Sequence, residues 1–385
     1  MQRLTPTLRH YDWGTTDDIP RLLGFGPDGT PYAEAWWGAH DSAPSWVPDE
    51  HGHMPLDELI AKHPVDMLGA DAVARWGARL PYLLKVLAIN KPLSIQVHPT
   101  LEQAREGFAR EQRGTGGAPH SFLDPFHKPE MVVAITPMRV LAGVRDLQET
   151  AEDLRALGTA RADVLAGALA RADDAEAFLA DVLTRGADHD TYAALARVGG
   201  ASAPGTSLRA AADALAHFPD DPGAIVALAL NLVELEPGEA VFTGAGILHS
   251  YQSGLGVEIM ANSDNVVRAG LTPKHINVPL LLSLANAVPA MAARPTEWRD
   301  GPVRRLETVE DEFALTVVNE GKAIVGEDPR IVLCVTGTAT IAAAGEVKNL
   351  TAGQALFVRA SEGDAEISAE GIAAVAHTAC RRAEM

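Results

Sequence analysis

Polar side chains with metal-binding chemistry stand at alternate positions in the segment KPLSIQVHP, residues 91–99. If this segment is a strand, Ser94, Gln96 and His98 share one face, because successive side chains of a strand point to opposite sides. The intervening apolar residues then face a core. A strand of this kind borders either a polar cavity or solvent, and the segment taken alone leaves both interpretations open.

Two later segments add a carboxylate and a second histidine. Glu130 stands at the start of an apolar run, where a carboxylate is costly to bury unless it is paired or bound to a metal. His249 and Tyr251 share one face of the segment that follows the glycine turn at residues 244–246. A single histidine is more often structural, but two histidines, a carboxylate and a carboxamide on separate β segments favour a metal site. The predicted ligands are Gln96, His98, Glu130 and His249.

These residue types narrow the choice of metal. Nitrogen and oxygen ligands without a thiolate suit zinc, manganese or iron, and four protein ligands with space for another suit a catalytic site. A single carboxylate leaves the centre with net positive charge. Such a metal can act as a Lewis acid on a substrate oxygen.

The overall charge excludes some partners. The chain has 385 residues and a formal net charge of −19, which opposes binding to nucleic acid and to anionic membranes. We find no N-terminal apolar segment typical of a signal peptide and no run of about 20 apolar residues, so we expect a cytoplasmic protein. Cys334 and Cys380 are widely spaced, and we expect both to be reduced thiols.

Charged and apolar side chains alternate between residues 256 and 274. Glu258, Asp264, Arg268 and Lys274 lie in this stretch. A solvated loop would carry the same charges, but the interspersed valine, isoleucine and leucine residues indicate a packed segment. Because the background is acidic, an anionic ligand needs a local basic pocket. The residues available for it are Lys85, Lys128, Arg268 and Lys274.

The elements that must position these residues change character along the chain. The first 143 residues are rich in Pro, Gly and Trp, with short apolar runs at 83–89 and 131–135 that are typical of strands. Residues 147–218 are rich in alanine and carry a helical apolar stripe at Phe178, Leu179, Val182 and Leu183. We expect a helical insertion there, with a break between helices at 199–205.

Strand character returns after residue 220 and continues to the C-terminal region. Apolar runs at 331–335, 339–342 and 355–358 are each closed by glycine. Many short strands with glycine-rich turns predict a mainly β fold with two jelly-roll barrels and a helical insertion. The predicted regions are a catalytic barrel at 1–143 and 221–275, an α-helical insertion at 144–220, and a C-terminal barrel at 276–385.

At this point the chain resembles the type I phosphomannose isomerases of the cupin superfamily, zinc enzymes that interconvert mannose 6-phosphate and fructose 6-phosphate. The resemblance covers the catalytic half, in the family's order. It rests on YDWG (11–14), EAWWGAHDSAPS (34–45), LPYLLKVLAINKPLSIQVHP (80–99), HKPE (127–130), GILHSY (246–251) and VEIMANSDNVVRAGLTPKH (257–275). It implies two cupin-type jelly-roll β-barrels, one zinc ion per chain, and a sugar phosphate as the small-molecule partner.

The resemblance also implies residue roles. The four predicted metal ligands coincide with the family's ligands, and Arg268 matches its essential arginine. The positions that match its pocket residues are Trp13, Lys85, Ser94, Lys128, Tyr251, Glu258, Asp264 and Lys274. His127 matches a histidine proposed to assist ring opening. Position 126 holds phenylalanine where the family often has asparagine, so the rim of the pocket is expected to differ in shape from that of the family.

The implied reaction moves a proton between C1 and C2 of the sugar through a cis-enediolate. Arg268 is too basic for an ordinary proton acceptor, so we expect it to stabilise charge and help orient the phosphate. The sequence does not decide which group is the general base, and the candidates are Asp264, Glu258, Lys128 and a metal-bound water. It also does not decide whether the enzyme acts in glycolysis or in GDP-mannose biosynthesis.

Two other functions compete with this one. An iron dioxygenase would use a similar metal barrel but has no general need for Lys128, Arg268 and Lys274. A sugar-phosphate-binding regulator without catalysis would not need the full set of metal and pocket residues. We expect the chain to act as a monomer, the C-terminal barrel to cover the catalytic region, and His377 to be structural.

Overall fold

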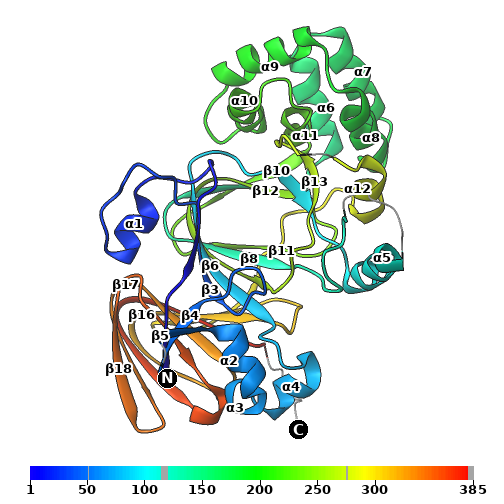
Figure 1. Ribbon diagram of the computed structural model, residues 1–385. Coiled ribbons are helices and arrows are strands. Elements are labelled where there is room, and N and C mark those ends of the chain that lie inside the picture. The colour runs from blue at the N-terminus through cyan, green and yellow to red at the C-terminus, as the bar shows by residue number, and fades with distance from the viewer. Residues whose placement is uncertain (51, 114–119, 275, 380–385) are drawn as a thin grey trace.

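The computed structural model describes residues 1–50, 52–113, 120–274 and 276–379, so Cys380 and the last residue of the 257–275 motif lie outside it. The fold is mainly β-sheet with helices. Its strands form a ten-stranded sheet, an eight-stranded sheet and one small hairpin. Figure 1 shows the ten-stranded sheet in the middle, the helical region at one end and the eight-stranded sheet at the other.

The ten-stranded sheet carries the predicted site. Its main path is β10 (Leu230–Leu235), β9 (Met138–Val144), β12 (His249–Ala261), β6 (Tyr82–Ile89), β3 (Glu34–Gly38) and β2 (Thr7–Arg9). Its branches are β7 (Ile95–Val97), β8 (Glu130–Ala134), β11 (Ala240–Thr243) and β13 (Val267–Gly270). The long strand β12 is the hub, because it pairs with β6, β7, β8 and β9.

The second sheet is built mostly from the C-terminal region. Its order is β1 (Gln2–Leu4), β19 (Ala355–Val358), β17 (Arg330–Ala343), β20 (Ala365–His377), β16 (Ala314–Val325), β15 (Val303–Glu307) and β14 (Thr296–Asp300), with β18 (Glu346–Thr351) on β17. The small hairpin joins β4 (Trp46–Asp49) to β5 (Gly52–Pro55). The two predicted jelly-roll barrels are not confirmed, because no strand pair within the described residues closes either large sheet into a barrel.

Two details of this sheet differ from the sequence analysis. Strand β1 pairs with β19, so the first residues join the C-terminal sheet although they were grouped with the catalytic region. The runs at 331–335 and 339–342 are one strand, β17, rather than two. The strand continues through Gly337, whose φ of 68° is accessible to glycine, and a Cβ there would lie 1.9 Å from the carbonyl oxygen of Glu370.

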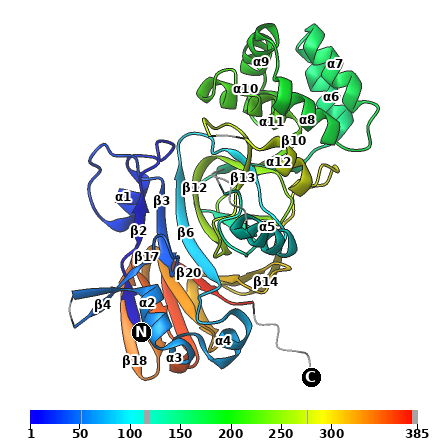
Figure 2. The ribbon, with the colours of Figure 1, turned by 45° about the vertical axis from the view of Figure 1, so that its right-hand side comes forward.

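Helices fill the predicted insertion at 144–220. They are α6 (Leu147–Ala156), α7 (Ala160–Leu169), α8 (Glu176–Arg185), α9 (His189–Ala201) and α10 (Ser207–His217). A further helix, α11 (Gly223–Leu228), lies beyond the predicted end of the insertion, where strand character was expected. The expected break at 199–205 begins later, because α9 runs through Gly199. A Cβ at Gly199 would lie 2.4 Å from the carbonyl oxygen of Leu208, so this glycine allows α10 to pack closely against α9. Figure 2 shows these helices gathered at one end of the molecule.

Other helices were not predicted. They are α1 (Asp18–Leu23), α2 (Leu56–Lys62), α3 (Pro64–Leu68), α4 (Ala70–Trp76), α5 (Leu101–Arg113), α12 (Val278–Leu284) and the short 3-10 turn at Ala360–Glu362. The two large sheets share one apolar core that includes Leu84 from β6 and Leu315 from β16. The buried hydroxyl of Tyr82 also donates to the carbonyl oxygens of Pro329 and Ala376. No described helix is both long and apolar enough to cross a bilayer.

Candidate metal centre and adjoining pocket

Strand register brings the predicted ligands together. On β7, Gln96 lies opposite His249 of β12 on one side and opposite Arg268 of β13 on the other. Glu130, the first residue of β8, lies opposite Met260 of the same long strand β12. His98 follows β7 directly. The strands β7, β8, β12 and β13 therefore bring polar side chains from distant parts of the sequence to one place.

A carboxylate lies between two imidazoles at this place. Oε1 of Glu130 is 3.4 Å from Nε2 of His98, and Oε2 of Glu130 is 3.2 Å from Nε2 of His249. All three side chains are buried, and the three ligand atoms lie within 4.8 Å of one another. This is the type and spacing of groups that hold a divalent metal ion.

Backbone acceptors orient both rings. Nδ1 of His98 lies 2.7 Å from the carbonyl oxygen of Asn265, and Nδ1 of His249 lies 2.8 Å from the carbonyl oxygen of Ile247. A carbonyl only accepts, so each Nδ1 carries a proton and donates it. In a neutral ring the Nε2 lone pair is then free and faces Glu130. Metal-binding histidines are typically fixed in this way by a partner on their second nitrogen.

Two buried atoms of the cluster have unused bonding capacity. Nε2 of His98 and Oε2 of Glu130 have no hydrogen-bond partner within the described chain, although both are buried. Unsatisfied polar atoms of this kind are costly unless something else binds them. The amide of Gln96 lies 3.3 Å from Nε2 of His249, and turning it by 180° presents its oxygen instead. The cluster therefore fits a metal ion with three or four protein ligands.

Protonation states also suit a metal. Burial lowers the pKa of His98 to about 4, although neighbouring Glu130 opposes this shift, so the ring is neutral near pH 7. Burial would raise the pKa of Glu130, but the positive charge of Lys128 outweighs it and holds the pKa well below its usual range. Nζ of Lys128 donates a 2.6 Å hydrogen bond to Oε1 of the same carboxylate. Metal ligands must be deprotonated, and these two are.

A pocket of about 380 Å³ opens beside the cluster. It is lined by Gln96 and Glu130, together with the predicted residues Trp13, Lys85, Ser94, Lys128, Tyr251, Glu258, Asp264, Arg268 and Lys274. Lys85 and Glu258 face each other across the β6–β12 ladder, with Nζ 3.1 Å from Oε2. Burial raises the pKa of Glu258, and the neighbouring carboxylates raise that of Lys85 although burial opposes the shift.

Two cations at the pocket wall lack a carboxylate partner within the described residues. Repulsion from Arg268, and then partial burial, lowers the pKa of Lys274. Burial lowers the pKa of Arg268 itself, and Tyr11 opposes this shift. Two close positive charges without a counter-ion form a binding place for an anion.

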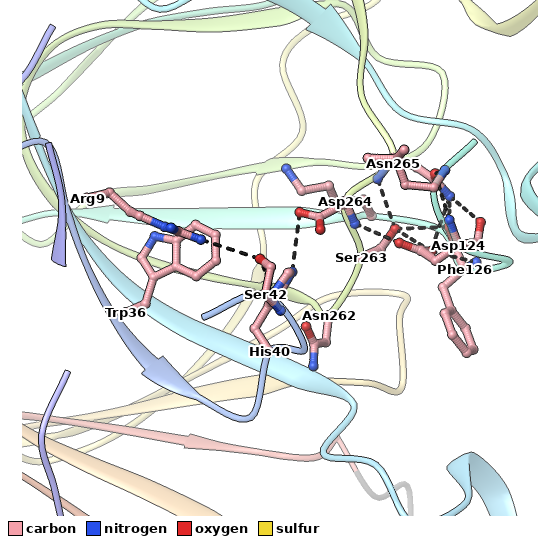
Figure 3. A network of polar contacts seen from close by, with 12 residues as sticks. Arg9, Trp36, His40, Ser42, Asp124, Phe126, Asn262, Ser263, Asp264 and Asn265 are labelled. Carbon is pink, nitrogen blue, oxygen red and sulfur yellow. Dashed lines mark hydrogen bonds and ion pairs between the residues drawn. The ribbon is translucent and has the colours of Figure 1, made fainter. Parts of the chain in front are cut away.

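A network of hydrogen bonds fixes the segment that carries Asp264 (Figure 3). Asp124 accepts from the backbone N–H of Asp264 at 2.8 Å and from the hydroxyl of Ser263 at 2.8 Å. The side chain of Asn265 donates to the carbonyl oxygens of Asp124 and Phe126. Because the backbone of Asn265 also accepts from His98, this network supports the metal centre and the pocket together.

His127 is the one predicted site residue that the structure does not bring to the metal centre or the pocket. Its Nε2 lies 2.8 Å from Oε1 of Glu312, and its Nδ1 lies 3.8 Å from Oε2 of Glu310. Both carboxylates belong to the loop between β15 and β16. The ring thus ties the segment before Glu130 to the C-terminal region. Phe126, the departure from the family pattern, stacks under the guanidinium of Arg79, whose Cζ atom is 3.8 Å from the ring centroid.

Two residues that we expected to be structural or inert are buried. His377 uses both ring nitrogens, one with the hydroxyl of Thr316 at 2.9 Å and one with the carbonyl of Thr378 at 2.8 Å. Cys334 is a free thiol, and burial raises its pKa to about 11.

The sequence analysis missed several residues of the pocket wall. Tyr11, Glu34, Trp36 and His40 all line it. Three of them stand within the EAWWGAHDSAPS motif, so the motif held the signal, although nothing local separated these side chains from core residues. Trp36 lies between two cations, with Arg9 4.6 Å and Lys85 4.7 Å from its ring centroid.

Comparison with known proteins agrees with this geometry. Residues 1–147 match the family model "Phosphomannose isomerase type I, catalytic domain". The chain is 32% identical to mannose-6-phosphate isomerase of Escherichia coli (strain K12), over 96% of this chain and 98% of that protein. It is 29% identical to the Homo sapiens enzyme of the same name, over 93% of each chain. A crystal structure of a variant phosphomannose isomerase from Salmonella typhimurium superposes with a TM-score of 0.90, at 30% identity, over 98% of this chain and 99% of that one.

Proposed function

We propose that this chain, which belongs to the type I phosphomannose isomerases, uses zinc as its metal. The residues that would hold the ion are Gln96, His98, Glu130 and His249. The chain is a metal-dependent aldose–ketose isomerase that interconverts mannose 6-phosphate and fructose 6-phosphate. What the proposal adds is the identity of the metal and the work of each residue. The buried His98–Glu130–His249 cluster, with its unsatisfied ligand atoms, is the observation that carries it.

The donor set supports zinc. Two neutral imidazoles and one carboxylate, with a carboxamide beside them, are nitrogen and oxygen ligands that zinc accepts readily. When bound, the ion would supply positive charge to the sugar oxygens that become negative during isomerisation. Lys128 adds a second positive charge, since its ammonium group lies against Glu130.

We assign the phosphate group to Arg268 and Lys274. Both line the pocket, and neither has a carboxylate partner within the described residues. Binding a phosphate there would remove the repulsion that lowers the pKa of Lys274. In a chain of net charge −19, this pair supplies the local positive charge that an anionic substrate requires. Arg268 faces Gln96 in the ladder, so it also reaches the metal end of the pocket.

We assign the proton transfer to Asp264. Its side chain is 43% exposed to the pocket, and a hydrogen bond from His40 lowers its pKa, so the carboxylate is ionised and accessible. The other candidates are less free to accept a proton. Glu258 is buried against Lys85, and Lys128 is held against Glu130. In this assignment Asp264 takes the proton from one sugar carbon and returns it to the neighbouring carbon of the cis-enediolate, while the hydroxyl proton passes in the same direction between the two oxygens.

We also propose how the chain is divided into regions. The catalytic region would comprise 1–143 and 221–275, the helical insertion 144–220 and the C-terminal region 276–385, with a cupin-type origin for both β regions. We propose that the chain works as a monomer and supplies sugar phosphate either to glycolysis or to GDP-mannose synthesis.

A dioxygenase is not favoured, because the Arg268–Lys274 pair has no purpose in that chemistry. A binding regulator without catalysis is not favoured either, because the ligand and pocket residues are all present.

Isomerisation in heavy water tests the role of Asp264. An enediolate exchanges its carbon-bound proton with solvent in part, so wild-type protein should introduce deuterium at C1 or C2 of the recovered sugar phosphates, as observed by NMR. Asp264→Asn should abolish both isomerisation and exchange while the sugar phosphate still binds. If Asp264→Asn kept near-native exchange and Glu258→Gln lost it, the assignment of the base would be wrong.

A further inference from the structure

His40 lies beside Asp264 in the pocket wall. The ring follows strand β3, is only 4% exposed, and places Nε2 3.3 Å from Oδ1 of Asp264. It packs edge-on against Trp36, with the ring centroids 5.1 Å apart and the planes at 67°. Figure 3 shows this contact next to the hydrogen-bond network that holds Asp264 from its other side.

The backbone of Ser42 fixes the proton position on this ring. The N–H of Ser42 points at Nδ1 of His40, with the two nitrogens 3.2 Å apart. A backbone amide can only donate, so Nδ1 must accept, and the proton of the neutral ring lies on Nε2. The nitrogen that carries this proton lies 3.3 Å from Oδ1 of the carboxylate. His40 cannot itself serve as the base, because one nitrogen is occupied by an amide and the other already carries a proton.

We propose that His40 is a positioning residue for the isomerisation, in which its Nε2–H keeps the Asp264 carboxylate ionised and turned toward the sugar. The proposal rests on the proposed role of Asp264 as the base. The proton on Nε2 stays on the ring throughout, while Asp264 accepts the proton from one sugar carbon and gives it to the next. His40 does not touch the substrate in this account.

A purely structural role explains the contact less well. The backbone of Asp264 is already fixed by Asp124, and the neighbouring Asn265 by three hydrogen bonds from its side-chain nitrogen. The loop therefore does not need a further bond to the carboxylate. What the His40 contact does change is the charge on that group, since this hydrogen bond is the largest influence that lowers the pKa of Asp264. Among the described residues, Lys128, Lys85 and Tyr11 also act on this carboxylate.

The pH dependence of turnover in His40 variants tests this role. His40→Phe keeps a ring against Trp36 and removes the donor, and His40→Leu removes both. His40→Gln restores an N–H near the position of Nε2. We expect His40→Phe and His40→Leu to lower kcat about 10–100-fold with KM little changed. Because the pKa of Asp264 should rise without its donor, the acidic limb of the kcat/KM profile should move to higher pH.

Three comparisons make the result decisive. His40→Gln should recover most of kcat and return the acidic limb toward its wild-type position. His53→Leu, which removes an exposed histidine from β5, should leave both unchanged. Thermal unfolding identifies any variant that has lost its fold. If one of His40→Phe and His40→Leu is unfolded, the position of the acidic limb of the kcat/KM profile is taken from the other. An acidic limb that stays in place in both His40→Phe and His40→Leu would overturn the proposal.

The companion variant Asp264→Asn separates this proposal from the one on which it rests. If Asp264→Asn is inactive and the donor-free His40 variants behave like wild type, only the role of His40 is wrong. If Asp264→Asn turns over normally, the role of Asp264 as the base fails first, whatever His40 does.

Discussion

The backbone carbonyl of Asn265 accepts a 2.7 Å hydrogen bond from Nδ1 of His98. The same residue follows Asp264 in the chain, and its side-chain oxygen accepts from the N–H of Leu123 at 2.7 Å. One tight turn therefore orients a predicted metal ligand, the proposed base and the loop that leads to Glu130. The metal centre and the sugar pocket share this support, so damage to it should affect both.

Substitution of Asp124 tests whether this hydrogen-bond network supports the metal centre. Asp124→Ala removes the acceptor for Ser263 and for the N–H of Asp264, so the ring of His98 should lose its fixed orientation. Because partners of metal-binding histidines typically contribute 10–100-fold to affinity, we expect a loss of about that size. Competition with a chromophoric chelator measures it. Asp300→Ala, at an exposed aspartate on β14, serves as the control, and equal affinities for the two variants would contradict the prediction.

Substrate binding should depend on the pair of cations at the pocket wall. Lys274→Gln removes one charged partner of the phosphate, so we expect KM for mannose 6-phosphate to rise about tenfold with a small change in kcat. The salt dependence of KM should weaken in the same variant. Lys322→Gln, on the exposed face of β16, is the matched control.

Arg268 should behave differently from Lys274, because it lies beside Gln96 at the metal end of the pocket. We expect Arg268→Ala to lower kcat about 100-fold or more, because the substitution removes a charged group that stabilises the developing enediolate. Steady-state kinetics of the two variants side by side decide this. Near-native turnover in Arg268→Ala together with no turnover in Lys274→Ala would reverse the two roles.

The pair of His127 and Glu312 should make stability depend on pH. Burial opposes the charge on each group, but their hydrogen bond outweighs it, raising the pKa of His127 and lowering that of Glu312. The contribution of His127 is complete below about pH 6.5 and is lost as the pH rises through its raised pKa. The contribution of Glu312 is complete above about pH 4.3 and is lost as the pH falls through its lowered pKa.

Glu312→Gln should therefore lower the free energy of unfolding by about 1–2 kcal/mol near pH 6 and by less near pH 9. Urea denaturation at the two pH values measures the difference. Glu366→Gln breaks an exposed pair and should change stability by at most about 0.5 kcal/mol at either pH. A loss of the same size at both pH values in Glu312→Gln would rule out the ion pair as its cause.

Local patterns allowed much of the candidate metal site to be predicted. Gln96 and Ser94 line the pocket, and His98 lies in the cluster with Glu130 and His249, which agrees with the alternation along one short strand. Glu130 begins a buried strand, where its charge needs compensation, and Lys128 lies two residues away. These relationships span a few residues each, so the sequence contains them directly.

Partners that are far apart in the sequence were beyond this reasoning. His127 pairs with carboxylates more than 180 residues away, and no local feature of HKPE points to them. Strand β1 joins a sheet made from residues beyond 296, through only three paired residues. The acceptor that orients His98 is a backbone carbonyl, which every residue type possesses. His40 was missed for a similar reason, since its role depends on Asp264 and on the N–H of Ser42.

The dependence of isomerisation on a bound metal is measured by turnover of mannose 6-phosphate with metal-free and zinc-restored protein. Fructose 6-phosphate would be followed through glucose 6-phosphate to NADPH, with the metal content per chain measured in each sample. We expect about one metal ion per chain, loss of turnover when a chelator removes it, and recovery with zinc for the wild type but not for Glu130→Ala. Full turnover by the metal-free protein, or none by the metal-loaded protein, would contradict this expectation.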